Sequence, residues 1–289
     1  MNFLSAVTKL TRIEHSLLLI IAVVAAELIS GGIPRLPIFA LSLITPFFVS
    51  MGAFAINDYF DVETDRANKR TDRPIVSGAI SRRSAYCVAI ASFAVGITAS
   101  AFINMYAFII ALVFAGLAYL YAQRMKDMLL VGNVYVAFSM VIPFIFGNIV
   151  VSSAISTSIV LISFVVFSSG LAREIHGMIR DRSGDIKVRG ARNLIRYIGV
   201  KKSATIALVL YIEAIGIGIF LFFYDFPFKY NFIYLALVTI ANLMFAYVAF
   251  GYMDRDNRKF FDLSRNLSLA GIGIALIAFL AAPIFYVGI

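Results

Sequence analysis

Three oxygen-bearing side chains lie at helical spacing directly after a long apolar run. Residues 36–56 are almost entirely apolar, and Asn57, Asp61 and Asp65 follow at steps of four residues. If a helix continues through them, their side chains share one face. Carboxylates at the edge of an apolar medium repel one another and are costly to desolvate. Because oxygen ligands suit Mg²⁺, the spacing predicts a magnesium site; the alternative is a charge-balanced polar loop.

A second acidic segment has the same layout. Asp181 and Asp185 are again four residues apart, and Glu174 and Met178 lie upstream on the same helical stripe. Arginines and lysines follow both segments, starting with Arg66, Lys69, Arg70 and Arg73 after the first. Two acidic faces with cations behind them favour a phosphorylated ligand held partly through metal. We expect both faces to meet across one cavity.

The elements that carry these residues are membrane-spanning helices. The chain has 289 residues, of which 61% are hydrophobic and 14% charged, and its mean hydropathy is +0.92. A helix needs roughly 20 apolar residues to cross a bilayer, and continuous apolar runs argue against a β-barrel. The sequence predicts an all-α polytopic membrane protein with nine spans, near residues 16–33, 36–56, 85–103, 105–122, 128–151, 155–172, 204–224, 232–253 and 267–287.

The basic residues indicate the orientation of these helices. With nine spans, all 25 lysines and arginines except Arg35 and Lys229 fall on the side of the N-terminus. This asymmetry places the N-terminus and the long loops 57–84 and 173–203 in the cytoplasm. Confinement to loops also argues against nucleic acid as the reason for the net charge of +9. The single cysteine, Cys87, rules out an internal disulfide.

The chain is predicted to be one transmembrane domain, residues 1–289. Residues 1–12 are expected to form an interfacial helix, because Phe3, Val7 and Leu10 share one helical face and basic residues lie nearby. Glu27 and Glu213 lie within apolar runs, where acids normally face the bundle interior, but no role is assigned to them. Since four helices separate the two acidic segments, the fold is expected to have nine helices around a central cavity, with two four-helix halves as a further possibility.

A third segment adds polar groups between these two. Tyr121 and Lys126 close the fourth span, and Gly132-Asn133 follow. Lys126 is a compact cation that reaches a phosphate, or else a positive-inside anchor. Carboxylates, metal and cations together would bind a diphosphate and stabilise the pyrophosphate that leaves. The membrane-embedded remainder, with 27 Phe and 14 Tyr, suits a long isoprenoid tail, and aromatic faces stabilise an allylic cation.

These motifs resemble the UbiA superfamily of intramembrane prenyltransferases. Asn57 to Asp65 match its N-D-x-x-D-x-x-x-D signature, and Asp181 with Asp185 match its second, D-x-x-x-D, motif. Asn68 and Asp72 to Gly78 resemble its N-R-P-x-R-P-I-x-S-G segment with one extra residue. Tyr121 to Lys126 and Gly132-Asn133 resemble its Y-x-x-x-x-K and G-N segment. Nine helices and an N-terminus on the inside also fit, so the resemblance covers nearly the whole chain, and three motifs on the appropriate helices are specific together.

The resemblance implies Mg²⁺-dependent transfer of a prenyl group from an isoprenyl diphosphate, such as geranylgeranyl diphosphate, to a lipophilic acceptor. By position, it assigns one metal to Asn57, Asp61 and Asp65, and the other to Asp181 and Asp185. The four aspartates of these two sets are the catalytic residues that it implies. The residues implied to bind the diphosphate are Arg70, Arg73, Lys126 and Tyr121. Asp58, which faces about 100° away from Asn57, is expected to serve structure instead.

One departure bears on the acceptor. The archaeal ether-lipid branch of this family typically reads R-E-I-x-K-D-x-x-D-x-x-G-D. Here Arg173-Glu174-Ile175 and Gly184-Asp185 are kept, but Gly177-Met178 replace Lys-Asp. A thioether does not replace a carboxylate on Mg²⁺, so Met178 is interpreted as a vacated ligand position or as a packing residue. The acceptor is either geranylgeranylglyceryl phosphate or an aromatic quinone precursor.

Two other functions compete with prenyl transfer. Membrane phosphatidyl transfer also uses Mg²⁺ and aspartates, but there the acids lie within one segment, whereas here two helices share them. A cation transporter would place its ionisable groups near the midplane, whereas these cluster at cytoplasmic helix ends. Tail length, acceptor and oligomeric state stay open at this point.

Overall fold

The computed structural model describes residues 3–128, 130–188, 194–255 and 257–286, and of residues 3 and 182–188 the backbone only. Helices make up the regular structure of these residues. The α-helices are α1 (Phe3–Thr11), α2 (Ile13–Ser30), α3 (Leu36–Ala67), α4 (Arg82–Ala101), α5 (Met105–Gln123), α6 (Val131–Val151), α7 (Thr157–Val188), α8 (Leu194–Tyr224), α9 (Phe232–Asp254) and α10 (Arg258–Ile284). A 3₁₀ turn, η1 (Met125–Asp127), lies between α5 and α6.

The predicted number of membrane spans is confirmed. Within the described residues, the nine helices α2 to α10 are long and apolar enough to cross a bilayer. The predicted loops 57–84 and 173–203 are shorter than expected, because residues 57–67 continue α3 and residues 173–188 continue α7. The polar residues are therefore carried on rigid helix ends. This is the condition under which the acidic residues share a face.

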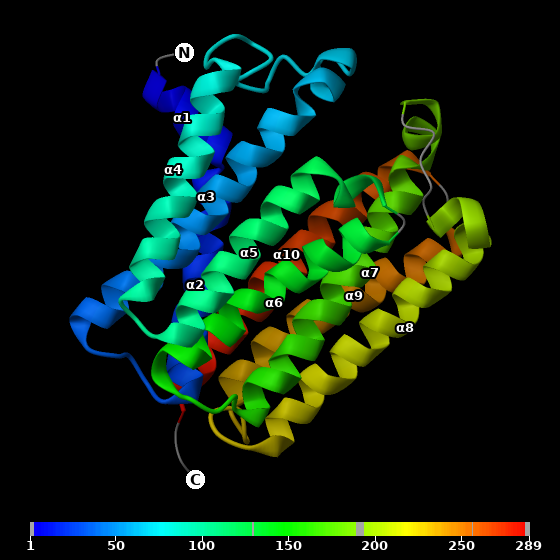
Figure 1. The fold of residues 1–289 in the computed structure, drawn as a ribbon. Coiled ribbons are helices and arrows are strands. Elements are labelled where there is room, and N and C mark those ends of the chain that lie inside the picture. The colour runs from blue at the N-terminus through cyan, green and yellow to red at the C-terminus, as the bar shows by residue number, and fades with distance from the viewer. Residues whose placement is uncertain (1–2, 129, 189–193, 256, 287–289) are drawn as a thin grey trace.

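Both helix ends lie at the same end of the bundle. Figure 1 shows the α3–α4 connection, the C-terminal end of α7 and the N-terminus together at the top, with the C-terminus at the bottom. Each helix from α2 to α10 packs against its neighbour in sequence, and α10 returns to pack against α2. Residues that are far apart in the sequence thus meet at one end of a closed arrangement.

Packing divides the helices differently from two equal halves. One hydrophobic cluster joins α1, α3, α4 and α5, and its fully buried members include Leu10 and Ile56. A second, larger cluster joins α2 with α6 to α10 around Tyr211, Phe245 and Phe279, and a small third cluster joins α2, α5 and α6. Because α2 packs against α6 and α10, it belongs to the second group. The possibility of two four-helix halves therefore gains no support from the cores.

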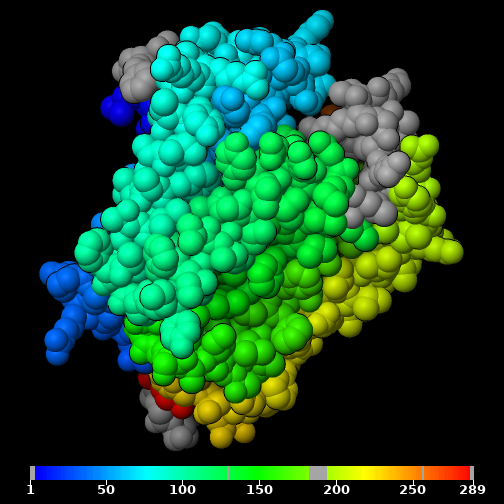
Figure 2. Space-filling model, viewed as in Figure 1, coloured from blue at the N-terminus to red at the C-terminus, as the bar shows by residue number. Residues whose placement is uncertain are grey.

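The outer face is apolar. In Figure 2, α4, α5 and α6 cover the face turned to the viewer. Exposed side chains of α5 and α6 include Ile109, Leu112 and Phe138. Glu27 is fully buried, as expected for an acid within a span. The expectation for Glu213 is wrong, because this residue is exposed on the outer side of α8. Its helical position, rather than its depth, decides which way it faces.

Candidate active site

Asp61 on α3 is the centre of the first polar cluster. Its Oδ2 accepts a hydrogen bond from Asn57 Nδ2 at 2.9 Å, one helical turn earlier. Its Oδ1 lies 2.5 Å from Lys126 Nζ, and both side chains are largely buried, with 16% and 13% exposed. The structure thus joins two residues that are 65 positions apart. It also confirms that residues 57 and 61 share one helical face.

Asp58 points to the other side of α3 and forms a structural ion cluster. The carboxylate is 2% exposed, and it accepts hydrogen bonds from Arg12 Nη2 at 3.0 Å and from Arg73 Nη1 at 3.1 Å. Arg12 lies at the α1–α2 junction with φ 46°, and its guanidinium stacks over Phe54 at 4.8 Å. Burial lowers the pKa of Arg12, and Asp58 opposes this shift. The cluster fixes α1 and the loop after α3 to the same helix.

Asp65 is held by the turn that ends α3. Lys69 has φ 53°, the N–H of Arg70 donates to Asp65 O at 2.9 Å, and the N–H of Lys69 donates to Arg66 O at 3.0 Å. This Schellman arrangement reverses the chain and brings Arg70 Nη1 to 3.6 Å from Asp65 Oδ1. Arg73 Nε lies 3.6 Å from Asp65 Oδ2. Two of the predicted diphosphate ligands therefore lie against a predicted metal ligand.

The loop after Arg73 is anchored in the core of α1, α3, α4 and α5. Ile75 and Ile80 are 6% and 4% exposed, and they belong to that hydrophobic cluster. Between them, Gly78 has φ +76°, a conformation that favours glycine. This explains why a Ser-Gly pair follows the Pro-Ile-Val stretch: it lets the loop turn back so that both isoleucines reach the core. The anchor limits where Arg73 can move.

The turn carrying Lys126 packs tightly on the start of α6. A Cβ at Gly132 would lie 3.0 Å from Lys126 Cα and 3.0 Å from Met125 O, closer than nearly all real contacts. The next residue, Asn133, donates from Nδ2 to Glu174 Oε2 at 3.3 Å on α7. Tyr121 stacks on Tyr135 with ring centroids 4.7 Å apart. The segment therefore links Asp61 on α3 to Glu174 on α7.

The second acidic motif is partly described. Asp181 is 54% exposed and receives a bidentate pair from Arg180, with Nε–Oδ1 at 2.8 Å and Nη2–Oδ2 at 2.7 Å. The Asp185 side chain lies outside the described residues. No contact between Asp61 and Asp181 is described, so their facing arrangement stays a prediction. Met178 is 9% exposed within the large hydrophobic cluster, which favours packing over a vacated ligand position.

The donor set at Asn57, Asp61 and Asp65 is chemically suited to Mg²⁺, since each side chain offers oxygen and Asn57 already contacts Asp61. Among the described residues, however, no three His, Cys, Asp or Glu side chains gather closely enough to hold a metal. Two features account for this. One predicted ligand is an asparagine, and Asp65 is turned towards Arg70 and Arg73. The residues fit the ion, but their carboxylates are paired with the protein's own cations.

Two functional contacts were missed by sequence reasoning. Arg12 contacts Asp58 across 46 positions, and Asn133 contacts Glu174 across 41. No periodicity links residues on separate helices, so only the side-chain types gave a signal. His176, the residue after Arg173-Glu174-Ile175, is instead a core residue: it is 4% exposed and stacks on Tyr252 with centroids 3.7 Å apart.

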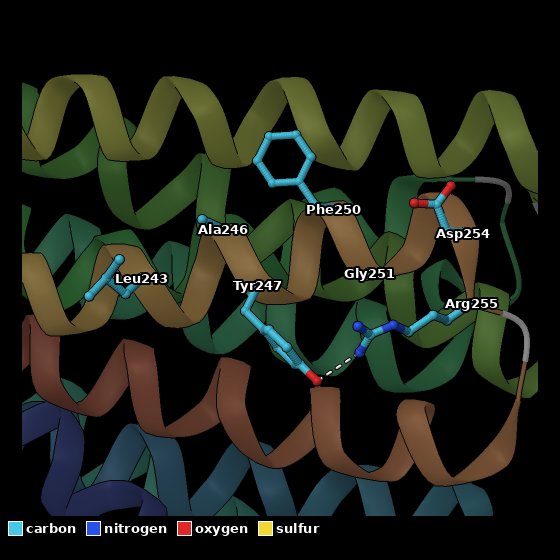
Figure 3. Close-up of a pocket in the computed structure, with 7 residues that line it drawn as sticks. All are labelled: Leu243, Ala246, Tyr247, Phe250, Gly251, Asp254 and Arg255. Atoms are coloured by element: carbon cyan, nitrogen blue, oxygen red, sulfur yellow. Dashed lines mark hydrogen bonds between the residues drawn. The ribbon is translucent and has the colours of Figure 1, made fainter.

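Two hollows on the described part of the surface lie away from the predicted ligands. Figure 3 shows a hollow of about 370 Å³ along the C-terminal half of α9, lined by Leu243, Ala246, Tyr247, Phe250, Gly251, Asp254 and Arg255. Arg255 Nη1 donates to Tyr247 Oη at 2.7 Å there. A second hollow, of about 270 Å³, includes Ile179 and Tyr252. Neither is lined by any predicted ligand of the metal or the diphosphate.

Comparison with known proteins gives a consistent result. Residues 18–270 match the UbiA prenyltransferase family. Digeranylgeranylglyceryl phosphate synthase from Archaeoglobus fulgidus is 35% identical over 286 residues, covering 97% of this chain and 96% of that protein. A solved structure of a digeranylgeranylglyceryl phosphate synthase has a TM-score of 0.78 at 27% identity, covering 98% and 99% of the two chains.

A more distant structure shares the fold. A UbiA homologue from Archaeoglobus fulgidus bound to GPP and Mg²⁺ has a TM-score of 0.65 at 18% identity, with 96% of this chain and 99% of that chain covered. The matches extend over nearly the whole chain, include all three polar segments and agree with the nine candidate spans. The chain therefore belongs to the UbiA prenyltransferase family and is an integral membrane prenyltransferase.

Proposed function

We propose that this enzyme transfers a geranylgeranyl group from geranylgeranyl diphosphate to geranylgeranylglyceryl phosphate, with Mg²⁺ as cofactor and release of pyrophosphate. Two sets of hydrogen-bonded polar groups support the site: Asn57 and Asp61 with Lys126, and Asn133 with Glu174. The first set joins α3 to η1, the second joins α6 to α7, and Gly132 packs on the Lys126 backbone between them. The acceptor follows from the synthase relatives and from Arg173-Glu174-Ile175, which resembles the ether-lipid branch.

The proposed roles follow from charge. Asn57, Asp61 and Asp65, with Asp181 and Asp185, would supply the oxygen ligands of Mg²⁺, which when bound would offset the negative charge of the leaving diphosphate. Arg70, Arg73, Lys126 and Tyr121 bind the diphosphate oxygens. The C1–O bond of the prenyl diphosphate breaks and its electron pair leaves with pyrophosphate. The acceptor hydroxyl oxygen then bonds to C1, and its proton passes to the released pyrophosphate. Asp58 and Arg12 hold Arg73 in place rather than bind ligand.

The proposed orientation places this end of the bundle, with the N-terminus, in the cytoplasm, where a soluble diphosphate and Mg²⁺ are available. Of the 25 basic residues, Arg35 and Lys229 alone fall on the opposite side. A membrane-embedded isoprenoid tail would extend from the polar end into the apolar interior. The lipid tails of both substrates are then kept out of water while the phosphates stay at the interface.

The test is an assay of purified protein with labelled geranylgeranyl diphosphate and a panel of acceptors. We expect pyrophosphate release, and a product of the matching mass with geranylgeranylglyceryl phosphate, both dependent on Mg²⁺. Product with an aromatic quinone precursor instead would overturn the acceptor and keep prenyl transfer. Release of a nucleotide monophosphate from an activated lipid would point to phosphatidyl transfer.

A further inference from the structure

We propose that Lys126 guards the metal position of Asp61, so that the enzyme takes up the divalent cation and the diphosphate together and binds either one weakly alone. This inference rests on the proposed function and concerns how its site loads. It starts from one regularity. In the structure, each acid of the first cluster is paired with a basic residue of the protein itself.

The pairing includes the predicted diphosphate ligands. Lys126 lies on Asp61, and Arg70 and Arg73 lie on Asp65. Arg73 also pairs with Asp58, where Arg12 adds a second cation. The predicted ligands of the metal and those of the anion are therefore partners of one another. The site is nearly neutral before any ligand arrives.

Charge counting shows what each ligand does by itself. With Asp72, which pairs with Arg70 at 3.5 Å, the cluster has four carboxylates and four cations, so it carries no net charge. A divalent ion alone would displace Lys126 from Asp61 and raise the net charge of the cluster by two. A diphosphate alone would draw the cations away and leave carboxylates beside an anion. When both ligands bind, the carboxylates contact the metal and the basic residues contact the diphosphate, so the net charge of the site stays close to zero.

The ion pair between Lys126 and Asp61 controls this change of partners. It is the closest of these ion pairs, at 2.5 Å, and its two side chains are largely buried, so solvent screens it weakly. The other oxygen of Asp61 is held by Asn57. A metal ion that binds Asp61 must therefore compete with an ammonium already in place. The contact of Gly132 with the Lys126 backbone keeps that ammonium within reach.

The experiment measures binding without turnover. Free Mn²⁺ is followed by its EPR signal in wild type, Lys126→Met and, as a charge-matched control at the opposite end of the bundle, Lys229→Met. We expect Lys126→Met to bind Mn²⁺ alone more tightly than wild type, by a factor on the order of ten, a usual size for coupling between sites. Lys229→Met should match wild type, and adding Asp61→Asn to Lys126→Met should abolish the gain.

A second measurement uses the wild-type protein and does not depend on a variant folding. Retention of labelled inorganic pyrophosphate is measured with and without Mg²⁺, and the thermal midpoint is followed with each ligand and with both. We expect retention to require Mg²⁺, and the stabilisation by both ligands to exceed the sum of the separate effects.

Two outcomes would overturn the inference. One is wild type binding Mn²⁺ alone as tightly as Lys126→Met. The other is pyrophosphate and metal stabilising the protein additively. If wild type retains pyrophosphate with Mg²⁺ and Asp61→Asn abolishes this retention, the proposed site stands. A negative result with Lys126→Met then overturns only the role inferred for Lys126. If wild type retains no pyrophosphate under any condition, the proposed function fails with it.

Discussion

At the scale of single residues, neighbouring acids on α3 have different environments. Asp58 is buried between Arg12 and Arg73, whereas Asp61, three residues later, pairs with Lys126 and Asn57. A buried carboxylate that is held by two guanidiniums is costly to rearrange, which suits a structural role. In the proposed function, a metal ion takes the place of Lys126 on Asp61 and the diphosphate binds Lys126, which suits a ligand role for Asp61.

The first prediction concerns the two acidic motifs. Asp61→Ala and Asp181→Ala should each reduce kcat/KM on the order of 100-fold or more, as removal of one charge-stabilising group does in other enzymes. The double variant should lose little more, because residues that act as one unit are non-additive. Steady-state kinetics at saturating Mg²⁺ provide the measurement. Multiplicative losses would mean two independent sites.

The second prediction concerns Met178. The side chain is buried among apolar neighbours, so Met178→Asp should destabilise the fold by on the order of 3 kcal/mol, as an uncompensated buried charge does. The Mg²⁺ concentration at half-maximal rate should not change. Thermal unfolding and a Mg²⁺ titration check both, with the volume-conserving Met178→Leu as control. A lower Mg²⁺ requirement in the aspartate variant would restore the vacated-ligand interpretation.

At the scale of helices, the extensions of α3 and α7 beyond their apolar parts carry the acids, and the α5–α6 segment joins them. The turn after α3 has Lys69 in the left-handed region, at φ 53°. Between α5 and α6, the absence of a side chain at Gly132 lets η1 approach the start of α6. A loop in place of these helix ends would not hold Asn57 and Asp61 one turn apart. The site therefore depends on helices that continue into water.

Helix α8 carries an acid on its outer side. Glu213 is exposed near the middle of the span, where a charged side chain that faces lipid costs about 3 kcal/mol. We predict that Glu213→Leu stabilises the protein in lipid nanodiscs by about 1–3 kcal/mol and leaves turnover unchanged. Ile212→Leu, an exposed neighbour, is the control. A lower thermal midpoint, or loss of an oligomer, would show that a partner holds this carboxylate.

At the scale of the whole molecule, the acidic residues lie on the ends of α3 and α7, which share one end of the bundle (Figure 1). Exposed apolar side chains cover the outer faces of the helices. This separation fits a reaction whose charged groups stay at the interface and whose tails stay in the membrane. The return of α10 to α2 closes the arrangement. The basic residues then identify the polar end with the cytoplasm in the proposed orientation.

The last prediction tests this orientation. In a Cys87→Ser background, Ser77→Cys lies in the exposed α3–α4 loop, and Ser153→Cys lies in the exposed α6–α7 loop at the other end. A membrane-impermeant maleimide added to intact cells should label residue 153 and spare residue 77. Permeabilised cells, in which both should react, are the control. Labelling of residue 77 in intact cells would reverse the proposed orientation.

The sequence by itself determined the class of the fold, the number of spans and the polar motifs. These depend on local quantities: apolar length, which a bilayer imposes, and helical periodicity, which put Asn57 and Asp61 on one face. The resemblance to the UbiA family also rested on local motifs, and the comparisons confirmed it. The continuation of α3 through residues 57–67 was only a condition of that interpretation, and the structure showed it.

Contacts between helices were decided only by the tertiary structure. Arg12 with Asp58, Lys126 with Asp61 and Asn133 with Glu174 each join residues more than 40 positions apart. Their side-chain types suggested charge pairing, but not which acid meets which cation. The outward position of Glu213 and the burial of Met178 likewise depend on how each helix is rotated against its neighbours. Rotation is set by packing with distant segments, and a hydropathy pattern that is apolar all round a helix carries little information about it.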